Sequence, residues 1–165
     1  MTKIEPKITE INQKKLVGYC LEMSLVNNMT QALFSGFMPK RKEIKNIISE
    51  DIYEIIEYDA SNFKKFSPSN LFTKWATLEV SSFETIPEGM KPLTLEKGLY
   101  AVFNYKGLAK DFSTLMQYIY GTWIQQSDYI LDDRPHFNVL GNKYKNNHPD
   151  SEEDVYIPLK KKDHV

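Results

Sequence analysis

The chain has 165 residues, of which 41% are apolar and 13% aromatic, and its formal charge at pH 7 is -1. A chain of this size buries about 70% of the surface that it exposes when unfolded, which suits a single domain over residues 1–165. The near-neutral charge provides no clustered basic face, so direct binding to nucleic acid or to an anionic membrane is not expected.

The residues that usually mark a location or a metal site are sparse. The N-terminus is charged and no apolar run approaches the ~18 residues of a membrane span, which predicts a cytoplasmic protein. Cys20 is the only cysteine, so an internal disulfide is excluded and a small core residue is expected. His136, His148 and His164 lack the spacing of metal ligands, and neither a metal nor a cofactor is predicted.

The first half of the chain reads as strand, helix, strand, strand. Residues 16–25 are rich in strand-forming types, and a helix with an apolar face is expected to begin near Thr30 and to kink or stop at Pro39. Residues 52–59 and 73–81 then predict two antiparallel strands joined by a long connection.

The second half repeats that order. Residues 83–98 contain two prolines and two glycines, which predicts a crossover loop without a regular element. A strand is expected at 99–105, followed by the clearest helix of the chain, whose apolar stripe runs from Phe112 to Ile124 at i, i+3, i+4 spacing. Residues 136–140 and 154–159 predict the last two strands, separated by a hydrophilic loop at 141–150.

The repeated order predicts an α+β fold made of two tandem strand-helix-strand-strand modules, at about 16–81 and 99–159. A duplicated unit generally brings its two sheets together around a pseudo-two-fold axis, which leaves a central cleft between the halves. The cleft is therefore the expected location of the functional site.

Strand alternation sorts side chains into a core set and a cleft set. In residues 73–81, Ala76, Leu78 and Val80 are expected beneath the helices, which leaves Trp75 and Glu79 on the opposite face. In residues 154–159, the same reasoning assigns Val155, Ile157 and Leu159 to the core and leaves Asp154 and Tyr156 opposite. Such a face is either an ordinary solvated sheet surface or a site that stacks a flat or cationic ligand on aromatic rings beside a carboxylate.

Four segments of the sequence together resemble one known family. These are Trp-Ala-Thr-Leu-Glu-Val-Ser-Ser at 75–82, Glu-Lys-Gly-Leu-Tyr-Ala-Val-Phe-Asn-Tyr-Lys-Gly at 96–107, Arg-Pro-His-Phe-Asn-Val-Leu at 134–140 and Glu-Asp-Val-Tyr-Ile-Pro-Leu at 153–159. They are similar to the GyrI-like small-molecule binding domain, which is also the effector-binding domain of some AraC-type and MerR-type transcription regulators. The resemblance implies a ligand cleft between two modules, and the early first strand suggests a stand-alone domain.

The resemblance implies three functions. The favoured one is a non-enzymatic module that binds or sequesters a hydrophobic small molecule, either neutral or cationic. The second is a hydrolase of cyclopropane-containing toxins, with Glu79 as general base and Tyr156 orienting the substrate. The third is a gyrase-inhibitor-like module that binds a protein partner, whose identity the residues do not reveal.

The sequence departs from the family at two acidic positions. The family commonly has Glu after the aromatic residue of the Arg-Pro-x-Phe strand, where this chain has Asn138, and the last strand has Asp154 in place of the usual Glu. An amide offers a dipole where a carboxylate offers a full counter-charge, so these changes weaken the expectation of tight cation selectivity. The predicted ligand-binding residues are Trp75, Glu79, Tyr100, Phe137, Asn138, Asp154 and Tyr156, with no catalytic or metal-binding residue assigned.

Overall fold

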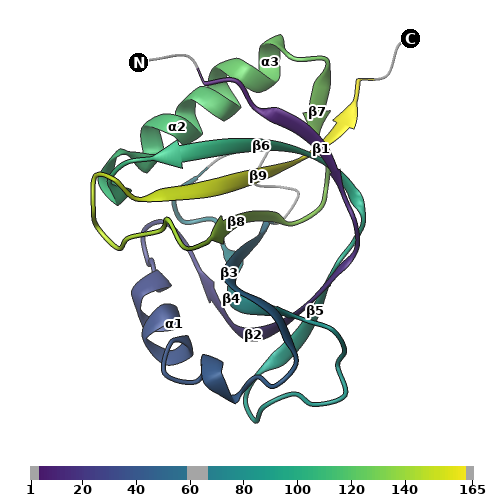
Figure 1. Cartoon of the computed structure of the whole chain (residues 1–165). Helices are drawn as coiled ribbons and strands as arrows, with labels where there is room; N and C mark the ends of the chain where they lie inside the picture. The colour runs from purple at the N-terminus through teal and green to yellow at the C-terminus, as the bar shows by residue number, and fades with distance from the viewer. Residues whose placement is uncertain (1–3, 59–66, 163–165) are drawn as a thin grey trace.

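The structure is a computed structural model that describes residues 4–58 and 67–162, and it is an α+β fold built on a nine-stranded antiparallel sheet. Its helices lie outside the curved sheet (Figure 1). The helices are α1 (Thr30–Phe37), α2 (Phe112–Tyr118) and α3 (Ile124–Gln126), with a π-helical turn at Ile119–Trp123 between the last two. The strands are β1 (Lys7–Ile11), β2 (Lys14–Met23), β3 (Ile47–Tyr58), β4 (Phe72–Val80), β5 (Lys91–Leu95), β6 (Gly98–Lys106), β7 (Tyr129–Leu131), β8 (His136–Leu140) and β9 (Glu152–Lys161).

The predicted strands correspond to β2, β3, β4, β6, β8 and β9, and helix α1 begins at the expected Thr30. The expectation that residues 83–98 contain no regular element is wrong, because β5 lies within them. Pro92 is compatible with β5 because the strand order places β5 at the end of the sheet, where a missing N–H is tolerated. Strands β1 and β7 were likewise not predicted; both are short and lack a strong apolar alternation.

The strands follow the order β1-β6-β9-β8-β3-β4-β2-β5, and β7 pairs with β9. The two ends of this order are joined by a long antiparallel ribbon. Strand β1 pairs with β6 from Lys7↔Val102 to Ile11↔Gly98, and β2 pairs with β5 from Lys14↔Leu95 to Gly18↔Lys91, in one continuous register. Because β1 leads directly into β2, and β5 into β6, this ribbon closes the sheet into a barrel.

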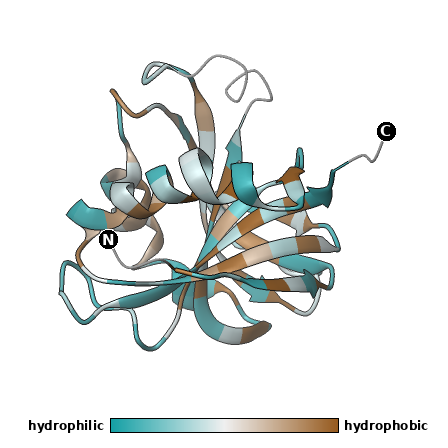
Figure 2. Cartoon of the chain, turned by 90° about the horizontal axis from the view of Figure 1, so that it is seen from above, coloured by the Kyte–Doolittle hydropathy of each residue, from teal (hydrophilic) through white to brown (hydrophobic). Residues whose placement is uncertain are grey.

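Two hydrophobic cores lie between the barrel and its helices. Leu33 and Phe37 of α1 pack on Ala76, Leu78 and Val80 of β4 in the first core. The second core joins α2 and α3 to β6 and β9 through Leu115, Ile119, Ile124, Phe103, Val155, Ile157 and Leu159. These are the core faces that strand alternation predicted, and the alternating pattern along the strands is visible in Figure 2.

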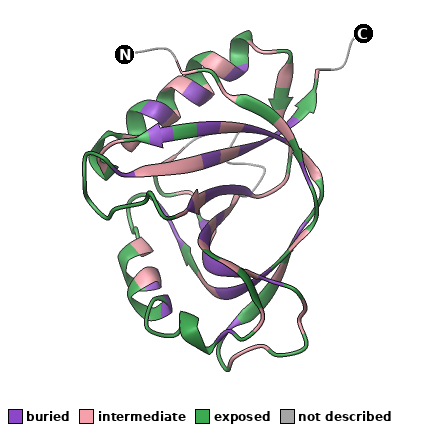
Figure 3. Ribbon diagram, viewed as in Figure 1, coloured by how far each residue is buried: buried purple, intermediate pink, exposed green. Residues whose placement is uncertain are grey.

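A third core fills the barrel interior, and we call it the barrel core. It contains Ile11, Leu16, Tyr53, Ile55, Trp75, Leu95, Tyr100 and Phe137, with Tyr156 and Val139 packed against it. Every strand of the closed ring contributes to this cluster or packs against it, and Figure 3 shows buried residues, in purple, along several of these strands. The side chains of this cluster pack against one another and occupy the centre of the barrel.

Arg134 connects two strands beside the barrel core. Its Nη2 donates to the carbonyl oxygens of Leu99 in β6 at 2.7 Å and of Leu159 in β9 at 2.9 Å. Its Nε donates to Asp132 at 2.6 Å, and its guanidinium lies 4.7 Å from the ring centroid of Tyr100. The Arg-Pro pair of the sequence therefore has a structural role at this position.

Replacing Arg134 with Lys is expected to lower the free energy of unfolding by about 2 kcal/mol, because an ammonium group cannot span two carbonyls and a carboxylate. Urea unfolding followed by circular dichroism measures this change. The matched control is Arg41→Lys in an exposed turn, which should change the stability by less than about 0.5 kcal/mol. Equal stability of the two variants would contradict the structural role.

In the described part of the chain, no helix is both long and apolar enough to cross a membrane.

Candidate functional site

Six of the seven predicted site residues belong to the inner face of the barrel. Trp75, Tyr100 and Phe137 are 7, 0 and 1% exposed and pack against one another and their neighbours in the barrel core. Tyr156 stacks on Phe137, with ring centroids 4.3 Å apart and an interplanar angle of 13°. Trp75, Tyr100 and Phe137 are thus packed in the barrel core, whereas Tyr156 is partly exposed at its margin.

Glu79 lies at the margin of the barrel core and is already paired. Its carboxylate is 3.6 Å from the Lys14 ammonium, which itself lies 5.7 Å from the ring centroid of Tyr53. Burial, followed by the nearby Glu79 carboxylate, raises the pKa of Tyr53 well above its ordinary value. Glu79 thus belongs to a structural ion pair inside the sheet.

Asn138 is separated from the other six residues, because it faces the opposite side of the sheet. It lies between Phe137 and Val139, which point into the barrel, so its own side chain points toward the helices. There its Nδ2 donates a 3.0 Å hydrogen bond to Oε1 of Glu54 on the neighbouring strand β3. Glu79 and Asn138 therefore do not face one site.

The two residues of this hydrogen bond belong to a group of four polar side chains on the helix-facing side of the barrel. We call this group the polar seam, and it consists of Glu54, Lys74, Asn138 and Glu153. The Lys74 ammonium is 3.9 Å from Oε2 of Glu54 and donates to Oγ1 of Thr30, at the start of α1, at 3.0 Å. The side chains of Glu54 and Lys74 are each 13% exposed, and Asn138 is 6% exposed. Charged groups are thus concentrated in a largely buried place.

The polar seam lies where the two helix cores meet. Across the sheet, Glu54 pairs with Ala76 of the α1 core on one side and with Asn138 on the other. Asn138 in turn pairs with Val155, which belongs to the core beneath α2. In this row of paired residues, the central strands β3 and β8 therefore carry the polar Glu54 and Asn138, whereas the neighbouring strands β4 and β9 carry the apolar Ala76 and Val155.

Aromatic rings border the polar seam along the same strands. The Tyr58 ring lies 4.9 Å from the His136 ring in an edge-on contact and 5.7 Å from the Phe72 ring. The Tyr120 hydroxyl, from the π-helical turn, lies 2.9 Å from Nδ1 of His136. Burial lowers the pKa of His136 to about 3, so this ring is neutral at physiological pH.

Burial also perturbs the acid of the polar seam on β9. It raises the pKa of Glu153 to about 7, and the nearby Glu54 carboxylate adds to this effect while Lys74 opposes it. Burial likewise raises the pKa of Tyr58 to about 12. A carboxyl group that titrates near neutral pH beside a second carboxyl group is typical of functional sites.

The functional candidates that sequence reasoning missed are Glu54, Lys74 and Glu153. The alternation of Tyr53, Glu54 and Ile55 in β3 is a signal that Glu54 lies opposite the aromatic face. The pairing of β3 with β8, which brings Glu54 to Asn138, joins residues 84 positions apart. No local pattern in the sequence carries that information.

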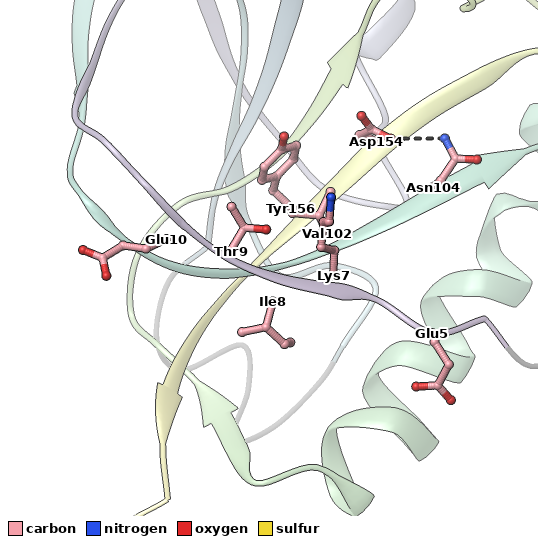
Figure 4. Close-up of a pocket in the computed structure, with 9 residues that line it drawn as sticks. All are labelled: Glu5, Lys7, Ile8, Thr9, Glu10, Val102, Asn104, Asp154 and Tyr156. Atoms are coloured by element: carbon pink, nitrogen blue, oxygen red, sulfur yellow. Dashed lines mark hydrogen bonds between the residues drawn. The ribbon is translucent and has the colours of Figure 1, made fainter.

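An open groove of about 810 Å³ lies beside β1 at one end of the barrel, and we call it the β1 groove. Asp154 and Tyr156 line it, with Asn104 donating a 3.1 Å hydrogen bond to Asp154. Figure 4 shows Asp154, Tyr156 and Asn104 on the same side of β1, with Thr9 directed toward them and Ile8 away. The other lining residues are Glu5, Lys7, Glu10 and Val102.

Within residues 4–58 and 67–162, no group of three or more His, Cys, Asp or Glu side chains is arranged to hold a metal ion.

Residues 7–159 match the profile of a family described as Cass2, the integron-associated effector-binding proteins. The chain belongs to the Cass2 family. The resemblance to GyrI-like effector-binding domains is thereby confirmed at the level of the family, and an effector-binding domain is its shared description. No curated protein matches the chain.

Solved structures place this Cass2-family chain in a widespread fold. SAV2435 bound to tetraphenylphosphonium is 15% identical, with a TM-score of 0.69, over 95% of this chain and 94% of that one. The C-terminal domain of EcmrR is 11% identical, with a TM-score of 0.72, over 97% of this chain and 99% of that one. A hydrolase from Listeria innocua is 11% identical, with a TM-score of 0.59, over 96% and 93% of the two chains.

Proposed function

We propose that this protein binds or sequesters a hydrophobic organic cation at the polar seam. The observation that carries the proposal is the nearly buried Glu54 carboxylate, which lies against Asn138 at the junction of the two helix cores. A largely buried carboxylate attracts a cation more strongly than an exposed one, because solvent screens it less. SAV2435, which shares the fold, has been solved with tetraphenylphosphonium.

In this arrangement Glu54 supplies the carboxylate that the family commonly has at position 138, where this chain has Asn. The Glu54 carboxylate lies one strand away, within hydrogen-bonding distance of the Asn138 amide. A negative charge is therefore available at almost the same place, although a different strand supplies it. The Lys74 ammonium, at 3.9 Å, is a weak internal counter-ion that a bound cation would compete with.

A tandem duplication around a pseudo-two-fold axis accounts for this site. Outward from the central β3–β8 pair, the first unit contributes β3, β4 and β2, and the second unit contributes β8, β9 and β6 in the same relative order. Glu54 and Asn138 then occupy matched positions on either side of the axis, and so do Lys74 and Glu153. The proposed ligand cleft lies on this axis, on the helix-facing side of the barrel.

The aromatic rings around the polar seam support a ligand that is apolar as well as charged. Tyr58 and Phe72 lie on the strands that carry Glu54 and Lys74, and the Tyr120 hydroxyl contacts His136 on the strand that carries Asn138. Cations that carry phenyl groups gain from both ring contacts and a counter-charge. A small inorganic cation would gain from the charge alone.

Titration of the full chain with tetraphenylphosphonium, followed by ¹H–¹⁵N NMR, tests the proposal. Binding is expected to shift the amides of Glu54, Asn138 and Glu153 in one saturable step. A titration in which these amides stay unchanged up to millimolar ligand would overturn the proposed site. Tetraphenylarsonium is a second probe of the same shape and charge, and it should shift the same amides.

The affinity for tetraphenylphosphonium is expected to rise roughly fivefold to tenfold between pH 6 and pH 8. Glu153 has a pKa of about 7, so it gains its negative charge in this interval, whereas the ligand itself does not titrate. Isothermal titration calorimetry at several pH values measures the change. Glu153→Gln should give nearly the same affinity at both ends of the range, and a variant that keeps the wild-type pH dependence would contradict the assignment.

A hydrolase is the second candidate, favoured by the raised pKa of Glu153 beside Glu54. In such a pair the protonated carboxyl group can act as a general acid while its ionised neighbour acts on water. This assignment replaces Glu79, which pairs with Lys14 on the other face of the sheet. Mass spectrometry after incubation with a cyclopropane-containing substrate distinguishes the candidates: a product heavier by one water supports hydrolysis, and unchanged substrate supports binding alone.

A further inference from the structure

The two ends of the barrel are closed differently. Toward one end the Trp75 indole packs in the barrel core with Ile55 of β3 and Cys20 of β2, its register partners on the two neighbouring strands. The indole is 7% exposed, and its Nε1 donates a 2.5 Å hydrogen bond to Glu57. The hydrogen-bonded pair of Trp75 and Glu57 thus occupies this part of the barrel.

At the other end the matched position carries a much smaller side chain. Asp154 lies between Val139 of β8 and Asn104 of β6, just as Trp75 lies between β3 and β2. The match follows from the duplication proposed above, which relates Glu54 to Asn138. Where the first half has an indole, the second half has the short Asp154 side chain, which borders the open β1 groove of about 810 Å³.

We propose that the β1 groove is a second small-molecule site, distinct from the polar seam, that binds a cationic alkylamine carrying a planar aromatic ring. The ligand ring takes the place that the Trp75 indole occupies at the opposite end. Asp154 accepts the hydrogen bond of the ligand nitrogen, as Glu57 accepts that of the indole.

The lining of the groove fits such a ligand. Tyr156 is half-buried at the floor, where its stacking on Phe137 holds the ring in a fixed orientation. Of the charged residues around the groove, Glu5, Glu10 and Asp154 are acidic and Lys7 is basic, so a cationic amine is favoured over an anion. The Asp154 and Asp51 carboxylates already act on the Tyr156 hydroxyl, because after burial they raise its pKa.

The groove and the polar seam open on opposite faces of the same sheet. Asp154 and Tyr156 point to the inner face of β9, whereas Glu153 and Val155 point to the helix-facing side. A ligand in the groove therefore leaves the Glu54–Asn138 hydrogen bond intact. The two sites are still linked electrostatically, because the Asp154 carboxylate contributes to the raised pKa of Glu153.

A titration of the full chain with tryptamine, followed by ¹H–¹⁵N NMR, tests this proposal. We expect saturable shifts of the Asn104, Asp154 and Tyr156 amides at roughly millimolar ligand, as is usual for a small, solvent-exposed ligand. Indole-3-acetate has the same ring with an opposite charge, and it should bind at least tenfold more weakly. Equal binding of both ligands, or no shift at these amides, would overturn the proposal.

Two variants sharpen the test. Asp154→Trp places an indole where the first half has one, and it should abolish the tryptamine shifts while tetraphenylphosphonium still shifts the Glu54 amide. Lys7→Gln, at an exposed position, should raise the tryptamine affinity about twofold to threefold by removing the basic residue of the lining. Tryptamine binding that survives Asp154→Trp unchanged, or that weakens in Lys7→Gln, would overturn the proposal even if the polar seam binds its cation normally.

Discussion

Glu54→Gln lowers the affinity for tetraphenylphosphonium by roughly tenfold to a hundredfold, the largest effect expected of any single change at the polar seam. The substitution keeps the size of the side chain and an oxygen that can accept the 3.0 Å hydrogen bond from Asn138. It removes only the negative charge, whose interaction with a cation in a poorly hydrated place contributes about 1.5–3 kcal/mol. Calorimetric titration at pH 8, where Glu153 is ionised, measures the change.

The matched control for this prediction is Glu79→Gln. Glu79 has the same side chain and the same 13% exposure as Glu54, but it lies on the inner face beside Lys14. Its replacement should change the affinity by less than about twofold, because the ligand does not contact that face. If both variants bind alike, the charge at Glu54 does not provide the recognition.

Gly18→Ala destabilises the fold by about 3 kcal/mol or more, the largest effect on stability that we expect from a single added methyl group. A Cβ atom at Gly18 would lie 1.8 Å from the carbonyl oxygen of Ala76 on the paired strand β4. The obstacle is backbone, which cannot rotate away, so β2 would have to separate from β4 at this position. Loss of the cooperative urea transition, or a large shift of its midpoint, is the expected observation.

Gly36→Ala is the matched control for Gly18. Gly36 lies on the exposed side of α1, and a Cβ there would meet no atom within 4 Å. The same methyl group should stabilise the protein by about 0.5–1 kcal/mol, because alanine is the better helix former. Opposite signs for the two variants support the close approach of β2 and β4, whereas two stabilising changes would contradict it.

Local patterns were sufficient for most of the elements. The apolar stripe from Phe112 to Ile124 was long enough to predict its helix, although a π-helical turn interrupts it at Ile119–Trp123. Alternation in β4 correctly assigned Ala76 to the core beneath α1 and Trp75 to the opposite face. Such patterns succeed because each depends on side chains a few positions apart.

The environment of the inner face could not be predicted from local sequence patterns. Alternation grouped Trp75 and Tyr156 on one face, and both pack in or against the barrel core. Whether that face lines a cleft depends on the ribbon that pairs β1 with β6 and β2 with β5. Because this ribbon closes the sheet, the aromatic rings pack against each other, and the charged site lies on the other face.

The sequence by itself determined the six strands and two helical segments of the two modules, the faces of β4 and β9, and the effector-binding resemblance, since these depend on neighbouring residues and short motifs. Only the tertiary structure decided that Glu54 lies beside Asn138, that Glu79 forms an ion pair with Lys14, and that Asp154 borders an open groove. The physical reason is strand register. A shift of β3 against β8 by one residue would turn Glu54 away from its partner, and that register is set by packing across the whole barrel.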